Sequence, residues 1–318
     1  MRKIQQNLFL YCLIVSMALA GSLIYFGSPP VAKSSNRRFG VTYMTMNNPF
    51  YPVLNNELVK YIEGNADQLI LRDPLLDEEK QIEQIEEFIE MGVEGIFINP
   101  VNSNTISPVL SKAAAHHIPV IIIDCPVDDQ EGITTQIYSD NYQAGVLCAQ
   151  DLMRRYEQGT IGLLEHSKVR SGAERIAGFV DTIAQDSRFS IVNRRECYGQ
   201  TETAMPAALD LLEESPNINF LMCLNDPSAI GAMAAVEYLQ RSDIHIYGVD
   251  GMPEFKSLLA CANAAEATAL QSPYTMAQKA AESMYAALNG QEVEKEVVIP
   301  VSLLNRENAA SNDLRSWQ

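Results

Sequence analysis

Residues 39–52 read FGVTYMTMNNPFYP and predict a strand, a polar turn and the start of a helix. The first six residues suit a buried strand, and Pro52 suits the first turn of a helix. In an open α/β sheet, ligands bind at the carboxyl ends of strands. Carboxamides both donate and accept hydrogen bonds, and aromatic rings offer flat apolar faces. The turn Asn47-Asn48-Pro49-Phe50-Tyr51 therefore indicates a site for a polyhydroxylated ring rather than for a phosphate or a metal.

Apolar strands alternate with helical patterns along the rest of the chain. Residues 119–123 are continuously apolar after Pro119, as expected for a parallel strand covered on both faces. Strands separated by helical patterns predict βαβ units and parallel sheets. A second set of units starts after Ser139-Asp140-Asn141, so the pattern predicts two similar lobes. The expected strands are 39–44, 69–71, 95–100, 119–124, 161–164, 190–192, 220–223, 245–248 and 267–270, and the clearest helices are 77–91, 105–116 and 229–240.

Composition restricts the function. With 318 residues the chain is long enough for two domains. A formal net charge of −17 argues against nucleic-acid binding, which needs Lys and Arg to neutralise phosphates. The four histidines accompany no nucleophile motif, and the sequence holds neither a phosphate-binding loop nor a dinucleotide motif. The acidic loop Asp128-Asp129 with Glu131 lacks the spacing of a calcium loop. We therefore expect no enzyme activity, no cofactor and no metal.

The amino-terminal segment predicts export. Met1-Arg2-Lys3 is basic, and the apolar run from Leu8 to Phe26 is marginally long enough to span a membrane. Ala18-Leu19-Ala20 fits a cleavage site, but the apolar run continues beyond it, which favours an uncleaved anchor over cleavage. We expect residues 1–27 to be a signal anchor or signal peptide and residues 28–38 a linker. The rest would lie on the extracytoplasmic face of the bacterial cytoplasmic membrane, in the periplasm or at the cell surface, anchored or secreted.

Cysteine usage indicates no disulfide framework. The number of cysteines outside the amino-terminal segment is odd, and none are closely spaced. We expect buried free thiols at Cys125, Cys148, Cys197, Cys223 and Cys261.

Polar residues also follow several other expected strands. Each of them alone is compatible with a helix N-cap, a common role of Asp and Asn. Together they lie at the same edge of their predicted sheets, where a ligand would bind. These residues are Asp124, Asn225-Asp226, Asp250 within Gly248-Val249-Asp250-Gly251, and Gln271.

These motifs carry a family resemblance. From about Phe39 to Val301 the chain resembles the ribose-binding-protein branch of the type I periplasmic solute-binding proteins. The matching segments are Asn47-Asn48-Pro49-Phe50-Tyr51, Ile98-Asn99-Pro100, Ser139-Asp140-Asn141, Asn225-Asp226, Gly248-Val249-Asp250-Gly251 and Gln271. The resemblance implies an α/β fold of two similar Rossmann-like lobes with parallel sheets, joined by a three-strand hinge. It places 39–139 and 272–300 in the N-terminal lobe, and 140–271 and 301–318 in the C-terminal lobe and tail.

The resemblance also implies which residues bind the ligand. Ribose binders of this family carry an arginine where Cys125 stands, and a second one where Ala173 stands, with Arg170 nearby as a substitute. Because arginine makes several directed hydrogen bonds, these departures favour a different pentose, a hexose, a modified sugar or a polyol over ribose itself. The implied ligand-binding residues are Asn48, Phe50, Tyr51, Asp124, Tyr198, Asn225, Asp250 and Gln271.

The implied role is that of a monomeric solute receptor that closes around a small sugar or polyol. It would deliver this ligand to the membrane subunits of an ABC transporter. Alternatively, it would present its closed state to a membrane histidine kinase or chemoreceptor, and an uncleaved anchor is compatible with both. If the start at Met1 is genuine, we expect no sugar-responsive repressor, because the export segment stands where a DNA-binding domain would be and the chain is acidic.

Overall fold

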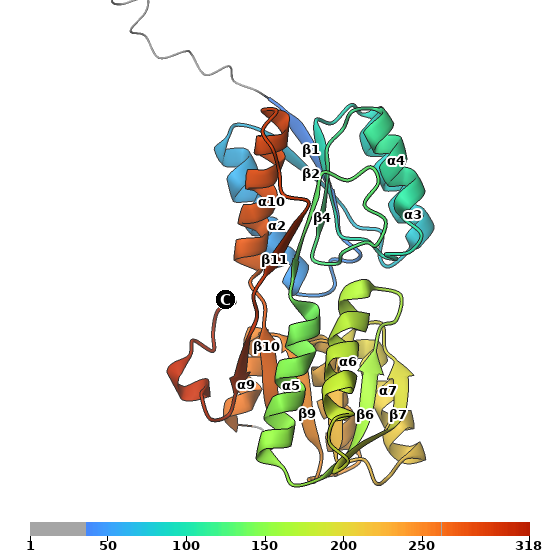
Figure 1. The fold of residues 1–318 in the computed structure, drawn as a ribbon, viewed down its shortest axis with the longest axis vertical. Helices are drawn as coiled ribbons and strands as arrows, with labels where there is room; N and C mark the ends of the chain where they lie inside the picture. The colour runs from blue at the N-terminus through green and yellow to red at the C-terminus, as the bar shows by residue number, and fades with distance from the viewer. Residues whose placement is uncertain (1–35, 262) are drawn as a thin grey trace, which may run out of the picture. The chain divides into compact units, whose positions relative to one another are not determined.

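A computed structural model describes residues 36–261 and 263–318. They contain two six-stranded sheets (Figure 1), with strand orders β11-β5-β4-β3-β1-β2 and β12-β10-β9-β8-β6-β7. The predicted signal segment, residues 1–27, and most of the linker lie outside the described residues. Within the described ranges, no helix combines the length and the apolar character needed to cross a membrane.

The first sheet and its helices form one lobe, and the second sheet and its helices form the other. The strands are β1 (Arg38–Thr42), β2 (Gln68–Arg72), β3 (Gly95–Ile98), β4 (Val120–Ile123), β5 (Thr135–Ser139), β6 (Gly159–Glu165), β7 (Phe189–Glu196), β8 (Phe220–Cys223), β9 (His245–Asp250), β10 (Ala265–Leu270), β11 (Glu296–Ile299) and β12 (Ser302–Asn305). The helices are α2 (Phe50–Gly64), α3 (Glu78–Glu90), α4 (Ser107–Ala115), α5 (Asn141–Arg155), α6 (Arg170–Ile183), α7 (Thr201–Glu214), α8 (Asp226–Tyr238), α9 (Pro253–Cys261), α10 (Pro273–Leu288) and the 3-10 helix η1 (Ala309–Ser311).

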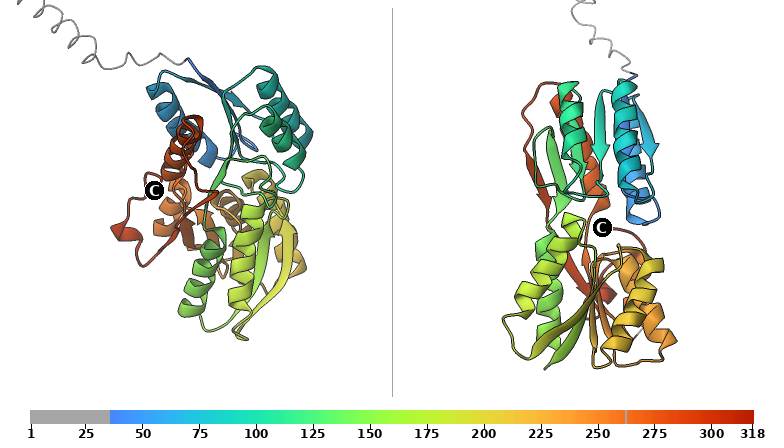
Figure 2. Two further views of the ribbon diagram at one scale, coloured as in Figure 1. Left: turned by 45° about the horizontal axis from the view of Figure 1, so that its top comes forward. Right: turned by 90° about the vertical axis from the view of Figure 1, so that its right-hand side faces the viewer.

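Five strands of each sheet repeat one arrangement, β2-β1-β3-β4-β5 in the first and β7-β6-β8-β9-β10 in the second. The described pairs are parallel except β10 with β12, which is antiparallel. Helices cover the faces of both sheets (Figure 2), so the central strands are buried on both sides and consist of apolar residues. The expected α/β fold of two similar lobes is confirmed, with one antiparallel edge strand as a departure from purely parallel sheets.

Local sequence explains why helix α3 starts where it does. The Asp77 side chain accepts a hydrogen bond from the Lys80 N–H at 3.0 Å and caps the helix. Glu78 and Glu79 lie in the first turn, where their negative charges interact favourably with the positive end of the helix dipole. Phe88 and Ile89 are among the buried residues of this helix. Since α3 spans Glu78–Glu90, the expected helix 77–91 is confirmed.

The chain passes between the two sheets three times. The passages follow β5 at Ser139, follow β10 at Leu270, and lie between β11 and β12 near residue 300. Because the strand order reverses next to β1 in the first sheet, a ligand crevice is expected beyond the carboxyl end of this strand. The turn that starts with Asn47 occupies that position.

The cysteine prediction is partly wrong. The cysteines among the described residues are free, and Cys125, Cys148, Cys197 and Cys223 are buried. Cys261, the last residue of α9, is exposed instead, and its Sγ bonds to the Ser257 carbonyl one turn earlier.

Candidate ligand-binding site

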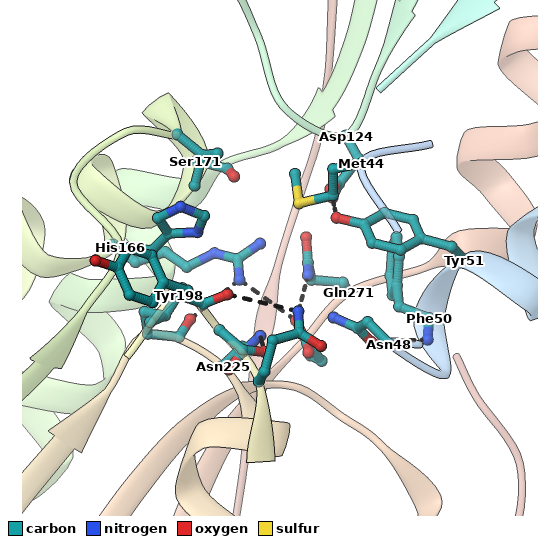
Figure 3. Close-up of a pocket in the computed structure, with 16 residues that line it drawn as sticks. Met44, Asn48, Phe50, Tyr51, Asp124, His166, Ser171, Tyr198, Asn225 and Gln271 are labelled. Atoms are coloured by element: carbon teal, nitrogen blue, oxygen red, sulfur yellow. Dashed lines mark hydrogen bonds and ion pairs between the residues drawn. The ribbon is translucent and has the colours of Figure 1, made fainter. Parts of the chain in front are cut away.

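Residues from both lobes line one cavity (Figure 3). The first lobe contributes residues that follow β1 and β4, and the second contributes residues that follow β6 to β10. Every one of the eight residues expected from the sequence lines this cavity, although their role in binding remains a prediction. The lining is Met44, Asn48, Phe50, Tyr51, Asp124, His166, Val169, Ser171, Arg175, Tyr198, Gly199, Gln200, Leu224, Asn225, Asp250 and Gln271.

Hydrogen bonds hold the first-lobe wall in place. The Tyr51 hydroxyl donates to Asp124 Oδ2 at 3.1 Å, and Asn99 Nδ2 donates to the same oxygen at 3.2 Å. Asn48 Oδ1 accepts from the Phe50 N–H at 3.0 Å, which fixes the turn at the start of α2. This bond leaves the Asn48 amide nitrogen directed toward the middle of the cavity (Figure 3).

The second-lobe wall centres on Asp250. Its Oδ1 accepts from Gln271 Nε2 at 2.7 Å and lies 3.4 Å from Arg175 Nη1. Arg175 also donates to Asn141 Oδ1 at 2.8 Å and to the Leu224 carbonyl at 3.0 Å. These bonds fix the guanidinium beside the cavity.

Two glycines bring α6, which carries Arg175, close to α5. A Cβ on Gly145 would lie 1.9 Å from the Arg175 carbonyl oxygen, and one on Gly178 would lie 2.0 Å from the Tyr142 carbonyl oxygen. Both approaches are shorter than any side chain allows, so only glycine permits this helix pairing. The close contact places Arg175 within reach of Asn141 at the start of α5.

Three oxygen atoms of the cavity have no hydrogen-bond partner among the described residues. They are Asp124 Oδ1 from the first lobe, and Asp250 Oδ2 and Gln271 Oε1 from the second. A buried acceptor without a donor costs about 1–3 kcal/mol. When the two carboxyl groups are ionised all three oxygens are acceptors, so a molecule with several O–H donors would satisfy them, and it would have to touch both lobes.

Burial also controls the charge of the cavity. Removal from water raises the pKa of the Asp124 carboxyl, while the Arg175 charge and the bonds from Tyr51 and Asn99 oppose this shift. Burial likewise raises the pKa of Asp250 well above its usual range, again opposed by Arg175. Desolvation lowers the pKa of His166, which favours the neutral imidazole. The Arg175 guanidinium therefore lowers the pKa of both carboxyl groups, Asp124 and Asp250, against the effect of burial.

Three of the predicted residues have a strained backbone. Asp124 has a φ of 67°, Tyr198 of 54° and Asp250 of 137°, all in the region that favours glycine. Such conformations cost about 1–3 kcal/mol each and concentrate at functional sites. At Asp124 and Asp250 the strain coincides with an unpartnered carboxylate oxygen, which supports a ligand role for both.

Asn225 has a structural role as well. Its Oδ1 accepts from the N–H and the hydroxyl of Ser228 at 3.0 and 2.6 Å and caps α8. Its Nδ2 donates to the Gly199 carbonyl at 3.0 Å, so one amide hydrogen remains for a ligand.

The Tyr198 ring is half exposed and stands perpendicular to the His166 ring, with ring centroids 5.5 Å apart.

The most important residue that the sequence analysis missed is Arg175. Arg170, considered as the substitute for a missing arginine, does not line the cavity and instead pairs with Asp128 and Glu174. Cys125 does not line the cavity either, and its Sγ lies 3.1 Å from Ser103 Oγ. The lining also includes Met44, His166, Ser171 and Gln200, which no sequence motif indicated.

Comparison with known proteins agrees with this geometry. Residues 39–292 match the family described as "Periplasmic binding protein domain". The chain belongs to this family. The ribose import binding protein of Bacillus subtilis strain 168 is 28% identical over 283 residues, covering 86% of this chain and 91% of the relative. The family and this relative are binding proteins. Membership of the family therefore agrees with the expectation that the chain is not an enzyme.

Two solved structures of binding proteins share the fold. An ABC transporter solute-binding protein from Mycobacterium smegmatis with bound glycerol has a TM-score of 0.83 and 25% identity, over 89% of this chain and 100% of the other. The binding protein of the arabinose ABC transporter from Shewanella sp. ANA-3, bound to L-arabinofuranose, has a TM-score of 0.81 and 25% identity. The match covers 86% of this chain and 93% of the other. These similarities confirm the expected resemblance to the ribose-binding-protein branch of the family.

Proposed function

We propose that this chain is an extracytoplasmic receptor that traps a small sugar or related polyol between its lobes and delivers it to an ABC transporter. The observation that carries the proposal is the set of three unpartnered buried acceptors, Asp124 Oδ1, Asp250 Oδ2 and Gln271 Oε1. Hydroxyl groups of a sugar are donors of the required kind. The names of the relatives, which include ribose and arabinose binders, support the same class of ligand.

The ligand contacts divide between polar and apolar groups. Asp124, Asp250 and Gln271 accept hydrogen bonds from hydroxyls, while Asn48, Asn225 and Arg175 donate to ligand oxygens. The rings of Phe50, Tyr51 and Tyr198 provide the apolar walls. These assignments include the eight residues expected from the sequence and add Arg175. Because a single arginine lines the cavity, we favour a sugar or polyol other than ribose.

Binding acts through lobe closure. Asn47 Nδ2 of the first lobe donates to Glu202 Oε1 of the second at 2.9 Å, and Arg170 Nη1 lies 3.0 Å from Asp128 Oδ1 on the other lobe. These contacts join the lobes beside the cavity. A ligand that bonds to both walls shifts the equilibrium toward this closed form, which the membrane partner then recognises.

A thermal-shift screen of the full-length chain tests the proposal. The panel contains ribose, arabinose and other pentoses, hexoses, glycerol and other polyols, nucleosides and amino acids. A ligand that binds only the folded state raises the melting temperature, so we expect a selective increase with one sugar or polyol. Asp250→Asn should abolish most of the increase, and the exposed Asp243→Asn should preserve it. Absence of any increase with the sugars and polyols would contradict the proposal.

We further propose that the apolar segment before residue 28 tethers the receptor to the membrane. Its length and the basic residues Arg2 and Lys3 support this orientation. Membrane fractionation of expressing cells, with mass spectrometry of the amino terminus, is the test. An intact Met1 in the membrane fraction is expected, and a soluble chain beginning after Ala20 would show cleavage instead.

A further inference from the structure

The carboxyl-terminal tail, residues 306–318, is attached to the second lobe over most of its length. It follows β12 of the second sheet, and its short helix η1 contacts α9. Leu314 packs against the second-lobe core. The ammonium group of Lys256, on α9, donates to the carbonyl oxygens of Asp313 and Ser316 at 2.7 and 2.5 Å. The tail is therefore held on this lobe as far as residue 316.

The next residue contacts the other lobe. Trp317 is only 9% exposed and packs within a core cluster made mostly of first-lobe residues, which also includes Val169 and Met252 of the second lobe. Its ring stands at 72° to the Phe50 ring, with 5.5 Å between centroids. Figures 1 and 2 show the carboxyl terminus at the level between the two sheets. The tail thus connects the lobes through side-chain packing, in addition to the three covalent passages.

This contact reaches the cavity through one ring. Phe50 lines the cavity and is 2% exposed, whereas Trp317 itself does not line it. The Phe50 ring stands perpendicular to its neighbour Tyr51, at 5.7 Å between centroids, and Trp317 packs on it as a second aromatic partner. Two partners of this kind restrict the orientation of the Phe50 ring.

Opening of the lobes must break one end of this connection. Releasing the tail would break the two charge-assisted hydrogen bonds that Lys256 donates to it and would expose Leu314. Separation of Trp317 from Phe50 loses one aromatic contact and exposes apolar surface, which costs less. The contact between these two rings should therefore exist in the closed form alone.

We propose that Trp317 is a positioning residue of the ligand site, which holds the Phe50 ring against the bound solute when the lobes close. The inference rests on the proposed solute-binding function and adds to it a dependence of affinity on the tail. Trp317 acts through Phe50 and makes no contact with the solute.

The chain contains a single tryptophan, so its fluorescence reports on this contact directly. Ribose, arabinose and glycerol are added in turn, and the one that raises the melting temperature should shift the emission to shorter wavelength and reduce quenching by acrylamide. Trp317→Ala should raise Kd about 10-fold, mainly through faster dissociation, because the aromatic contact stabilises the closed form. Trp317→Phe should restore most of the affinity. Tyr238→Ala, which removes an aromatic side chain that is 71% exposed, should leave Kd unchanged.

A second experiment needs no solute. Asn47→Cys and Glu202→Cys place thiols on opposite lobes, Cys261→Ser removes the exposed thiol of the described residues, and Cys12→Ser removes the thiol of the amino-terminal segment. Closing the lobes with a short bismaleimide should shift the tryptophan emission as the solute does. Unchanged emission after cross-linking would overturn the role of Trp317, as would unchanged affinity in Trp317→Ala. If cross-linking shifts the tryptophan emission but no sugar or polyol does, the contact between Trp317 and Phe50 in the closed form is supported, and the proposed solute class is wrong.

Discussion

Arg175 and Asp250 form a buried ion pair beside the cavity, with Nη1 3.4 Å from Oδ1 and side chains only 5% and 3% exposed. The guanidinium satisfies one oxygen of the carboxylate and leaves the other, Oδ2, without a partner. Arg175 therefore positions the acceptor that we propose binds the ligand, and we expect it to stabilise the fold as well.

Replacing Arg175 should be costly for folding. Arg175→Met leaves the Asp250 carboxylate buried without its counter-ion and removes the bonds to Asn141 and Leu224. We expect the free energy of unfolding, measured by urea denaturation, to fall by about 3–5 kcal/mol. The control is Arg188→Met, which breaks an exposed pair with Asp186 and should leave the free energy of unfolding nearly unchanged. Equal losses of unfolding free energy in Arg175→Met and Arg188→Met would show that the buried pair stabilises the fold no more than the exposed pair does.

Two phenylalanines should separate binding from folding. Phe50 lines the cavity, whereas Phe220 lies in the second-lobe core, 4.8 Å from the Tyr156 ring and 5.1 Å from the His245 ring between centroids. Phe50→Ala should raise Kd for the solute more than Phe220→Ala does.

Phe220→Ala should instead lower the free energy of unfolding by about 3–5 kcal/mol, as for other buried phenylalanines. Calorimetric titration and urea denaturation of both variants provide the two measurements. A stably folded Phe220→Ala protein that has lost affinity would contradict this division of roles.

Arg170 should affect closure rather than ligand contact. Its guanidinium lies 3.0 Å from Asp128 and 3.3 Å from the Val127 carbonyl, both on the opposite lobe. Since Asp128 is 78% exposed, we expect Arg170→Met to raise Kd by no more than about 5-fold.

The effect of Arg170→Met should also shrink as ionic strength rises, because salt screens exposed charges. Titrations at low and high salt measure it, with Lys112→Met as the control, since that pair with Glu86 lies within one lobe. A large effect that does not respond to salt would indicate direct contact with the solute.

The sequence predicted those parts of the fold in which local pattern and burial agree. β3, β4 and β8 are buried at every position, so each is a continuous apolar run. β11 and β12 lie at sheet edges and include exposed residues, which leave no such run, and neither was predicted. The predicted site residues share one cavity because the carboxyl ends of parallel strands converge.

Arg175 and Trp317 were missed for a different reason. An arginine within a helix is normally solvated, but Arg175 is only 5% exposed, on a helix that closely approaches α5 at Gly145 and Gly178. Trp317 lies in a polar tail whose neighbours give no periodic signal. Both roles depend on contacts between segments far apart in the chain.

The Asp226 carboxyl should make stability depend on pH. It is fully buried, accepting from the Met252 N–H at 2.7 Å and from the Thr268 hydroxyl at 2.8 Å. Burial raises its pKa from 3.8 to about 7 despite these bonds. Between these values the folded state binds more protons than the unfolded state. The free energy of unfolding should therefore fall as pH rises from about 4 to about 7, and then level off.

Asp226→Asn removes the titrating group, and the difference in unfolding free energy between wild type and variant isolates its effect. That difference should favour the wild type most near pH 4 and decline toward pH 7, as measured by urea denaturation at half-unit steps. The pKa of the control residue Asp243 is lowered by Arg241, and its side chain is 60% exposed, so Asp243→Asn should produce a small slope of opposite sign. Parallel curves for wild type and Asp226→Asn would show that Asp226 is ionised throughout this range.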